Sequence, residues 1–280
     1  MIKTFQELNP LERTRLFEFV HRLAPGRFSD EAMMEKAYGG VVYDRGKSQF
    51  SSWENGAVTG SVALVTKEID ARGEAFLHQV LIEQQKAFAS LLERAIAVCP
   101  ETISLKLGLP PEREELAAIA RAHGFSDAYS LLEMAYSHHD WEPVETLCLE
   151  PLKRENRKVF QSILNAAFLH SPNGGQLTDE EIEGLLGEGS PRGIAIWNGE
   201  AVGVYERSVK EDESWIDTLG IHPEYQKKGL GKALLKAVLA ECLPATKLTV
   251  MSSNQAAVGL YRSHGFGREC VLSVWLEKRL

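Results

Sequence analysis

The 280-residue chain has few cysteines, no long apolar run and no excess of positive charge. Its four cysteines lie far apart and form no Cys-x-x-Cys pair, which argues against a zinc site, a redox pair or a disulfide framework. No stretch of about 18 apolar residues occurs, and the N-terminal residues lack the apolar core of a signal peptide. We therefore expect a cytoplasmic protein with buried thiols and no membrane partner.

The charge balance is acidic, with 31 Lys and Arg against 39 Asp and Glu and a net charge of −8. A chain of this sign repels phosphate backbones, so no nucleic-acid partner is expected. The 44% of hydrophobic residues is ordinary for a globular protein and excludes intrinsic disorder. The length corresponds to about two domains.

An internal repeat accounts for those two domains. The segment Ala122–Ser126 resembles Ser263–Gly267, and the turn Trp53–Val58 resembles Trp197–Val202, at nearly one offset along the chain. A third pair of anchors agrees: Leu91, Leu92 and Cys99 correspond to Leu234, Leu235 and Cys242. We expect two copies of one domain.

The join between the copies is expected near Ser137–Pro143, where polar residues and a proline interrupt the pattern. This places one domain at residues 1–140 and the other at residues 141–280.

The second copy alternates strand and helix patterns in a way that predicts an α/β fold with a mixed sheet. Its Asn-Gly turn indicates a hairpin, while later strands are separated by helices. We therefore expect two tandem domains, each with a mostly antiparallel mixed sheet flanked by helices. The expected strands are Thr146–Leu152, Ile194–Trp197, Val202–Glu206, Trp215–Ile221, Lys247–Met251 and Cys270–Leu276, and the expected helices are Arg154–Leu169, a helix opening at Thr178, Gly231–Cys242 and Asn254–Ser263.

A glycine-containing loop between an expected strand and an expected helix is the most informative stretch. Gly229 and Gly231 allow backbone N–H groups to approach a ligand, and the helix N-terminus adds partial positive charge. Lys227, Lys228 and Lys232 add three cations in an acidic chain. The loop therefore predicts a pyrophosphate site, with a helix start carrying incidental glycines as the alternative.

Two other glycine-rich motifs do not fit this loop. A P-loop requires Ser or Thr after Gly-Lys, where this chain has Ala233. A dinucleotide fingerprint requires a third glycine, where this chain has Leu234.

Two signatures in this region resemble those of the GNAT N-acetyltransferase superfamily. Gln226–Gly231 matches (Gln/Arg)-x-x-Gly-x-(Gly/Ala), and the approach Leu219–Pro223 resembles the family's fourth strand. Asn254–Phe266 matches Asn-x-x-Ala-x-x-x-Tyr-x-x-x-Gly-Phe. The resemblance covers about the last 140 residues of the chain.

The resemblance implies that acetyl-coenzyme A binds where the fourth and fifth strands separate. Backbone groups of the fourth strand would pair with the pantetheine arm, and amides of the loop would hold the pyrophosphate. The residues implied are Leu219, Gly220, Ile221, Gln226, Lys227, Lys228, Gly229, Leu230, Gly231, Lys232 and Asn254.

The implied reaction moves an acetyl or short acyl group to a primary amine of a small molecule or peptide. Tyr261 matches the family's general acid towards the leaving sulfur, and a backbone N–H near Ile221 would polarise the thioester carbonyl. Asp217 and Glu206 are candidate bases, although for each a solvated strand carboxylate is the favoured interpretation.

The first copy departs from the signatures. Lys86 and Phe88 stand where Gly229 and Gly231 are expected, the preceding connection is shorter, and Ala120 stands opposite the tyrosine. The first copy is therefore interpreted as a degenerate domain.

A non-catalytic acyl-coenzyme A binding or sensing protein is the alternative function, although the retained tyrosine argues against it. No metal site is expected, since the neighbouring side chains of His138–Asp140 would point apart. The acceptor, the acyl preference, the general base, the role of the first copy and the oligomeric state stay open.

Overall fold

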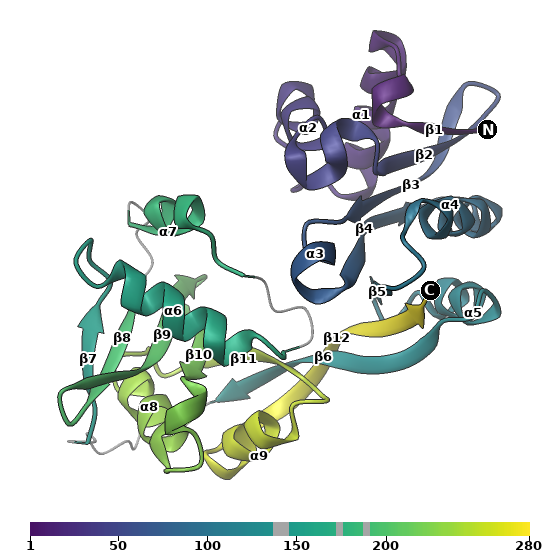
Figure 1. The fold of residues 1–280 in the computed structure, drawn as a ribbon. Coiled ribbons are helices and arrows are strands. Elements are labelled where there is room, and N and C mark those ends of the chain that lie inside the picture. The colour runs from purple at the N-terminus through teal and green to yellow at the C-terminus, as the bar shows by residue number, and fades with distance from the viewer. Residues whose placement is uncertain (137–145, 172–175, 187–190) are drawn as a thin grey trace. The chain divides into compact units, whose positions relative to one another are not determined.

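The computed structural model describes residues 1–136, 146–171, 176–186 and 191–280. The chain divides into two compact units, of which the first comprises Met1–Ser130 and Leu272–Leu280 and the second comprises Leu131–Val271 (Figure 1). The join predicted near Ser137–Pro143 lies outside the described residues.

The first unit consists of a mixed sheet with helices packed on it. Its elements are β1 (Ile2–Thr4), η1 (Phe5–Glu7), α1 (Pro10–Leu23), α2 (Glu31–Tyr38), η2 (Val41–Gly46), β2 (Gln49–Glu54), β3 (Ala57–Val65), α3 (Ile69–Arg72), β4 (Glu74–Ile82), α4 (Gln85–Val98), β5 (Ser104–Leu109), α5 (Glu114–Ala122), the first residues of β6 (Ser126–Tyr136) and the last residues of β12 (Phe266–Arg279). The strand order is β1-β2-β3-β4-β5-β12. Neighbouring strands are antiparallel except β4 and β5, which are parallel.

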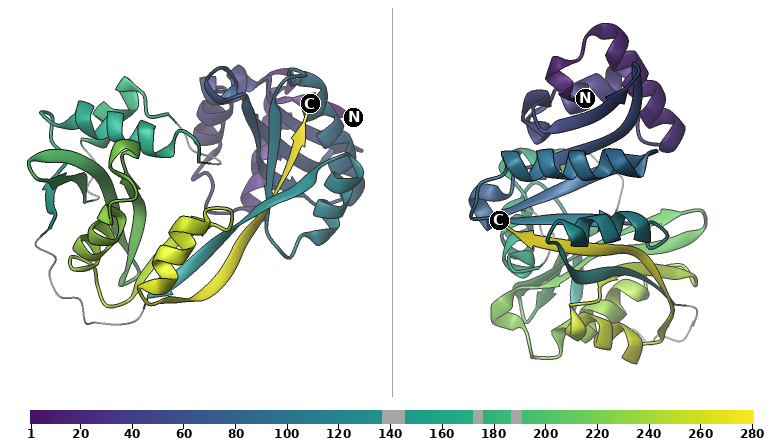
Figure 2. Two further views of the ribbon diagram at one scale, coloured as in Figure 1. Left: turned by 60° about the horizontal axis from the view of Figure 1, so that its bottom comes forward. Right: turned by 90° about the vertical axis from the view of Figure 1, so that its right-hand side faces the viewer.

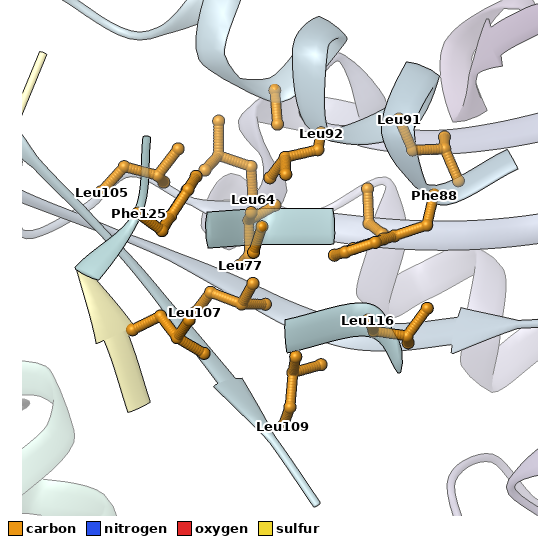
Figure 3. Packing of buried hydrophobic residues seen from close by; sticks show 14 of the residues in the cluster. Leu64, Leu77, Phe88, Leu91, Leu92, Leu105, Leu107, Leu109, Leu116 and Phe125 are labelled. Atoms are coloured by element: carbon orange, nitrogen blue, oxygen red, sulfur yellow. The ribbon is translucent and has the colours of Figure 1, made fainter. Parts of the chain in front are cut away.

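The first unit has two buried clusters: one lies between this sheet and helices α4 and α5, and the other includes residues of α1 and α2. Helix α4 carries apolar residues at helical spacing, so Phe88, Leu91 and Leu92 share one buried face. Figure 3 shows these side chains directed towards leucines of β3, β4 and β5.

The second unit repeats this architecture. Its further elements are β7 (Cys148–Pro151), α6 (Arg157–Phe168), α7 (Asp179–Leu185), β8 (Arg192–Trp197), β9 (Glu200–Lys210), β10 (Glu213–Ile221), η3 (Pro223–Tyr225), α8 (Leu230–Leu239), β11 (Thr246–Met251) and α9 (Gln255–Ser263). The strand order is β6-β11-β10-β9-β8-β7, and again one pair, β10 with β11, is parallel. Helices α6 and α7 lie on one face of the sheet, and α8 and α9 on the other (Figure 2).

The predicted fold class is confirmed, because each unit has a mostly antiparallel mixed sheet flanked by helices. Every element predicted for the second copy is present. The helix expected to open at Thr178 does so, because the Thr178 side chain accepts a hydrogen bond from the Glu181 amide in a capping box.

The two units have exchanged their last strands. The end of β6, from the first half of the chain, pairs with β11 in the second unit, and the end of β12 pairs with β5 in the first. Leu272–Leu280 therefore belongs to the first unit, whereas the expected division placed it in the second domain. Strand patterning does not report which sheet a strand joins, because either sheet offers the same buried face.

The duplication is visible in side-chain contacts as well as in topology. In each unit, a lysine of the parallel pair lies 2.6 or 2.7 Å from a glutamate oxygen and 5.7 Å from the centre of an aromatic ring. These residues occupy equivalent register positions. They are Glu74, Phe76 and Lys106 in the first unit and Glu213, Trp215 and Lys247 in the second.

Substitution of Leu276 by alanine tests the strand exchange. Leu276 lies on β12 with no exposed surface and belongs to the core of the first unit. We expect Leu276→Ala to lower the free energy of unfolding by about 2–5 kcal/mol and to speed amide exchange in β5. Leu272→Ala is the control, because Leu272 is 38% exposed on the same strand. Unchanged exchange in β5 would contradict the assignment of Leu276 to this core.

Candidate active site

The cavity of the second unit begins where β10 and β11 stop pairing. The two strands pair in parallel only over Ser214–Ile216 and Thr246–Leu248. Directly afterwards the register of β10 with β9 shifts between Ile216 and Thr218, which leaves Asp217 in a bulge. A bulge bends its strand, and a cavity of about 660 Å³ lies beside it.

Five residues predicted from the sequence line this one cavity: Asp217, Leu219, Gln226, Asn254 and Tyr261. Sequence reasoning missed several others, because nothing in their local pattern signals a ligand. The further lining residues are Leu131, Ala166, Ala167, Phe168, His170, Ser171, Ile216, Thr218, Pro223, Thr249, Val250, Met251, Ser253 and Ala257.

Tyr261 reaches the cavity from α9 and is only 8% exposed. Its ring lies 5.6 Å from the ring of Phe266, centre to centre. Burial raises the pKa of Tyr261 to about 12. Within the part of the chain that the structure describes, its hydroxyl forms no hydrogen bond. The phenol is therefore a protonated donor at neutral pH.

The two candidate bases differ in their surroundings. Glu206 lies outside the cavity lining, and its carboxylate is 2.7 Å from Nη2 of Arg192, a side chain that is only 5% exposed. Asp217 lines the cavity, and its nearest cation, Lys210 Nζ, is 3.9 Å away. A carboxylate held in a short ion pair gives up its charge at high cost, so Asp217 is the better placed of the two.

The predicted phosphate loop leads from the end of β10 to the start of α8. Gln226 Nε2 donates to the Ile221 carbonyl oxygen at 3.0 Å, which fixes the loop to the strand. Lys227 and Gly229 have left-handed backbone angles, with φ of 61° and 80°. Gly229 is the N-cap of α8 without a side-chain cap, so the first amides of the helix have no intrahelical partner. These amides and the exposed Lys228 suit a polyanion.

The glycines of this region have different physical roles. A Cβ at Gly220 would lie 2.9 Å from the Phe168 ring, so Gly220 is required for close packing of α6 on β10. A Cβ at Gly231 would meet only Leu260, at an ordinary 3.8 Å. Packing within the protein therefore explains Gly220 but does not require Gly231.

The first unit has no equivalent loop. Strand β4 ends at Ile82 and α4 begins at Gln85, with Phe88 buried in the first turns. Nη2 of Arg113 donates to the Ile82 carbonyl oxygen at 3.1 Å. Arg113 is the N-cap of α5, as Asn254 is of α9. The strand end that leads to the phosphate loop in the second unit is therefore occupied by a guanidinium in the first.

Neither a membrane-spanning helix nor a metal site is found among the described residues. No helix there is long and apolar enough to cross a bilayer. No group of three or more His, Cys, Asp and Glu side chains there is arranged to hold a metal ion. The sequence His138–Asp140 lies outside the described residues.

Residues 157–266 match the acetyltransferase (GNAT) family. This range contains the bulge, the predicted phosphate loop and Tyr261. The second unit carries a GNAT acetyltransferase domain. The GNAT match ends at Phe266, before the part of β12 that joins the first unit.

Curated relatives and solved structures agree with this assignment. A mycothiol acetyltransferase of Streptomyces griseus is 36% identical over 118 residues, which cover 39% of this chain and 38% of that protein. The chain thus matches less than half the length of this relative. A GCN5-related N-acetyltransferase from Sphaerobacter thermophilus has a TM-score of 0.62 at 12% identity, over 99% of this chain and 95% of that one. A tandem GNAT protein from the clavulanic acid biosynthesis pathway has a TM-score of 0.60 at 13% identity, over 99% and 98%. These two likenesses show that the whole chain has the tandem fold.

The raised pKa of Tyr261 predicts a pH dependence of stability. An unfolded tyrosine ionises near its ordinary pKa of 10, whereas folded Tyr261 ionises near 12. The stabilisation from the neutral phenol is complete below pH 10 and is lost as the pH rises towards 12. We expect the free energy of unfolding to fall more steeply over this interval in the wild type than in Tyr261→Phe. Equal slopes in urea titrations would contradict the buried, protonated state.

Proposed function

We propose that the second unit transfers an acetyl or short acyl group from acetyl-coenzyme A to a primary amine of a small molecule or peptide. The observation that carries this proposal is the shared cavity beside the bulge of β10. This cavity is lined by the phenol of Tyr261, the carboxylate of Asp217 and Gln226 at the start of the loop, beside the point where two parallel strands stop pairing.

Each part of acetyl-coenzyme A has a matching feature in this proposal. The pyrophosphate binds the free amides at the start of α8, aided by Lys227, Lys228 and Lys232. The pantetheine arm runs along β10 at Leu219–Ile221, and the Asn254 amide lies at the far wall of the gap. Leu230 packs into the core behind the loop and holds the helix start in place.

The reaction is direct attack of the neutral amine on the thioester carbon. A C–N bond forms, the C–S bond breaks, and the sulfur leaves with a proton supplied through the Tyr261 hydroxyl. Asp217 attracts the ammonium form of the acceptor to the cavity, and the proton lost from nitrogen leaves past its carboxylate through water. A backbone N–H near Ile221 donates to the oxyanion.

The first unit is proposed to be a degenerate copy without a coenzyme A site. A two-residue connection, Glu83 and Gln84, replaces the whole phosphate loop, and the Arg113 guanidinium binds the Ile82 carbonyl. Ala120, fully buried on α5, stands where a tyrosine would be needed. The proposed roles are therefore catalytic for residues 141–280 and structural for residues 1–140, apart from the exchanged strands.

The name of the Streptomyces griseus relative favours a small-molecule acceptor, although the match covers well under half of that protein. An acyl-coenzyme A sensor is the alternative. The Tyr261 phenol is buried and lacks a hydrogen-bond partner within the described protein. A transferase needs such a phenol as a proton donor, whereas a sensor does not.

Tyr261→Phe separates transfer from binding. We expect coenzyme A release with reactive amines to fall about a hundredfold in kcat, because the leaving sulfur loses its proton donor. The dissociation constant for acetyl-coenzyme A should change little. Tyr205→Phe is the matched control, since Tyr205 is buried in the same core but lies outside the cavity lining. Tight binding with no turnover of any amine by the wild type would favour the sensor.

Gly231→Glu tests the phosphate loop without disturbing the fold. Its Cβ would meet only Leu260 at 3.8 Å, and glutamate has a higher helix propensity than glycine and suits a helix N-terminus, so the melting temperature should be retained. We expect calorimetry to show one acetyl-coenzyme A bound per wild-type chain and an affinity at least about tenfold lower in the variant, because the added carboxylate repels the pyrophosphate. Gly259→Glu is the control, since its Cβ would meet nothing on α9. A second site that survives the substitution would contradict the proposed role of the first unit.

A further inference from the structure

The internal repeat allows residues around the cavity to be compared with their counterparts in the first unit. On β11, Thr249 stands directly opposite Glu133 of β6. On β5, Gly108 stands directly opposite Trp275 of β12. Because β5 and β11 occupy the same place in their sheets, these are equivalent pairs of positions.

In the first unit, aromatic rings fill this position. Trp275 covers Gly108 so closely that a Cβ there would lie 2.8 Å from the indole. The indole stacks on Tyr129 at 5.8 Å between ring centres and meets Phe76 edge to face at 6.5 Å. No polar ligand can reach this part of the sheet without displacing the tryptophan.

In the second unit, the same two positions are polar, and Thr249, which is exposed, lines the cavity. Glu133 faces the same side of the sheet as Thr249, because directly opposed residues of an antiparallel pair share a face about 5 Å apart. Leu131, two residues earlier on β6 and therefore on that face, also lines the cavity.

The charges around Glu133 leave its carboxylate able to bind a further cation. Lys247 Nζ lies 2.7 Å from Glu213 but 3.7 Å from Glu133, which is longer than a hydrogen bond. One lysine is thus shared by two carboxylates, and the group keeps a net charge of −1. Lys210 Nζ lies 3.9 Å from the Asp217 carboxylate.

We propose that Glu133 is a specificity-determining residue that binds a second cationic group of the acceptor, with Thr249 as a neighbouring hydrogen-bonding group. This inference rests on the proposed acetyl transfer and names its acceptor class: a primary amine that carries another cationic nitrogen. Glu133 on β6 and Asp217 on β10 are separated by β11, so their backbones lie at least two strand spacings, about 10 Å, apart. The acceptor is therefore a diamine or a longer polyamine rather than a monoamine.

The test compares amines that differ only in the charge at their far end. Coenzyme A release by the full chain is measured with α,ω-diamines, with monoamines of the same chain length, and with ω-amino acids, which carry a carboxylate there. We expect the wild type to favour diamines over monoamines by about tenfold in kcat/KM, mainly through KM. Glu133→Gln should abolish this preference and leave monoamine turnover within about twofold. It should raise kcat/KM for the ω-amino acids.

Two further variants guard against a purely structural effect. Glu133→Asp keeps the charge on a shorter side chain and should retain part of the diamine preference. Glu150→Gln removes an exposed carboxylate from β7, at the other edge of the same sheet, and should change nothing.

Several results would overturn the inference. If the wild type has the same kcat/KM for diamines and monoamines, it has no second cation site. If Glu133→Gln lowers kcat/KM equally for all three amine classes, the substitution causes a structural defect. If monoamines react but charge at the far end has no effect, only this inference fails. If acetyl-coenzyme A does not bind, or no amine releases coenzyme A, the proposed function itself fails.

Discussion

The second unit depends on the point at which two parallel strands stop pairing. Strand β10 leaves β11 after Ile216 because the bulge at Asp217 bends it away. The separation removes β11 as a partner for the backbone groups that follow on β10, and the cavity lies beside them. In the proposed function, the pantetheine arm of acetyl-coenzyme A supplies the missing partners.

The two units share one fold but differ beyond the parallel pair of strands. Both retain the parallel pair and its lysine, glutamate and aromatic ring, which stabilise the region before the strands part. Beyond it, the first unit has Phe88 in its core, the Arg113 guanidinium on the Ile82 carbonyl, and Trp275 over Gly108. These contacts agree with the proposal that the first unit has no coenzyme A site.

Strands β6 and β12 each contribute to the core of the unit that is formed mainly by the other half of the chain. The first unit cannot complete its core without Leu276, which comes from the end of the chain, and the second unit uses Met134 from the first half. Each unit therefore needs the other half of the chain to fold.

The sequence by itself determined the fold class, the repeat, and the loop from Gln226 to Gly231, because periodic apolar residues and glycine spacing are local properties of the chain. It also placed Tyr261 and Asp217 among the candidates. Only the tertiary structure separated Asp217 from Glu206, since the ion pair with Arg192 joins residues on different strands. The strand exchange and the position of Glu133 opposite Thr249 were likewise decided by tertiary structure, because pairing partners depend on contacts between distant segments that no local pattern records.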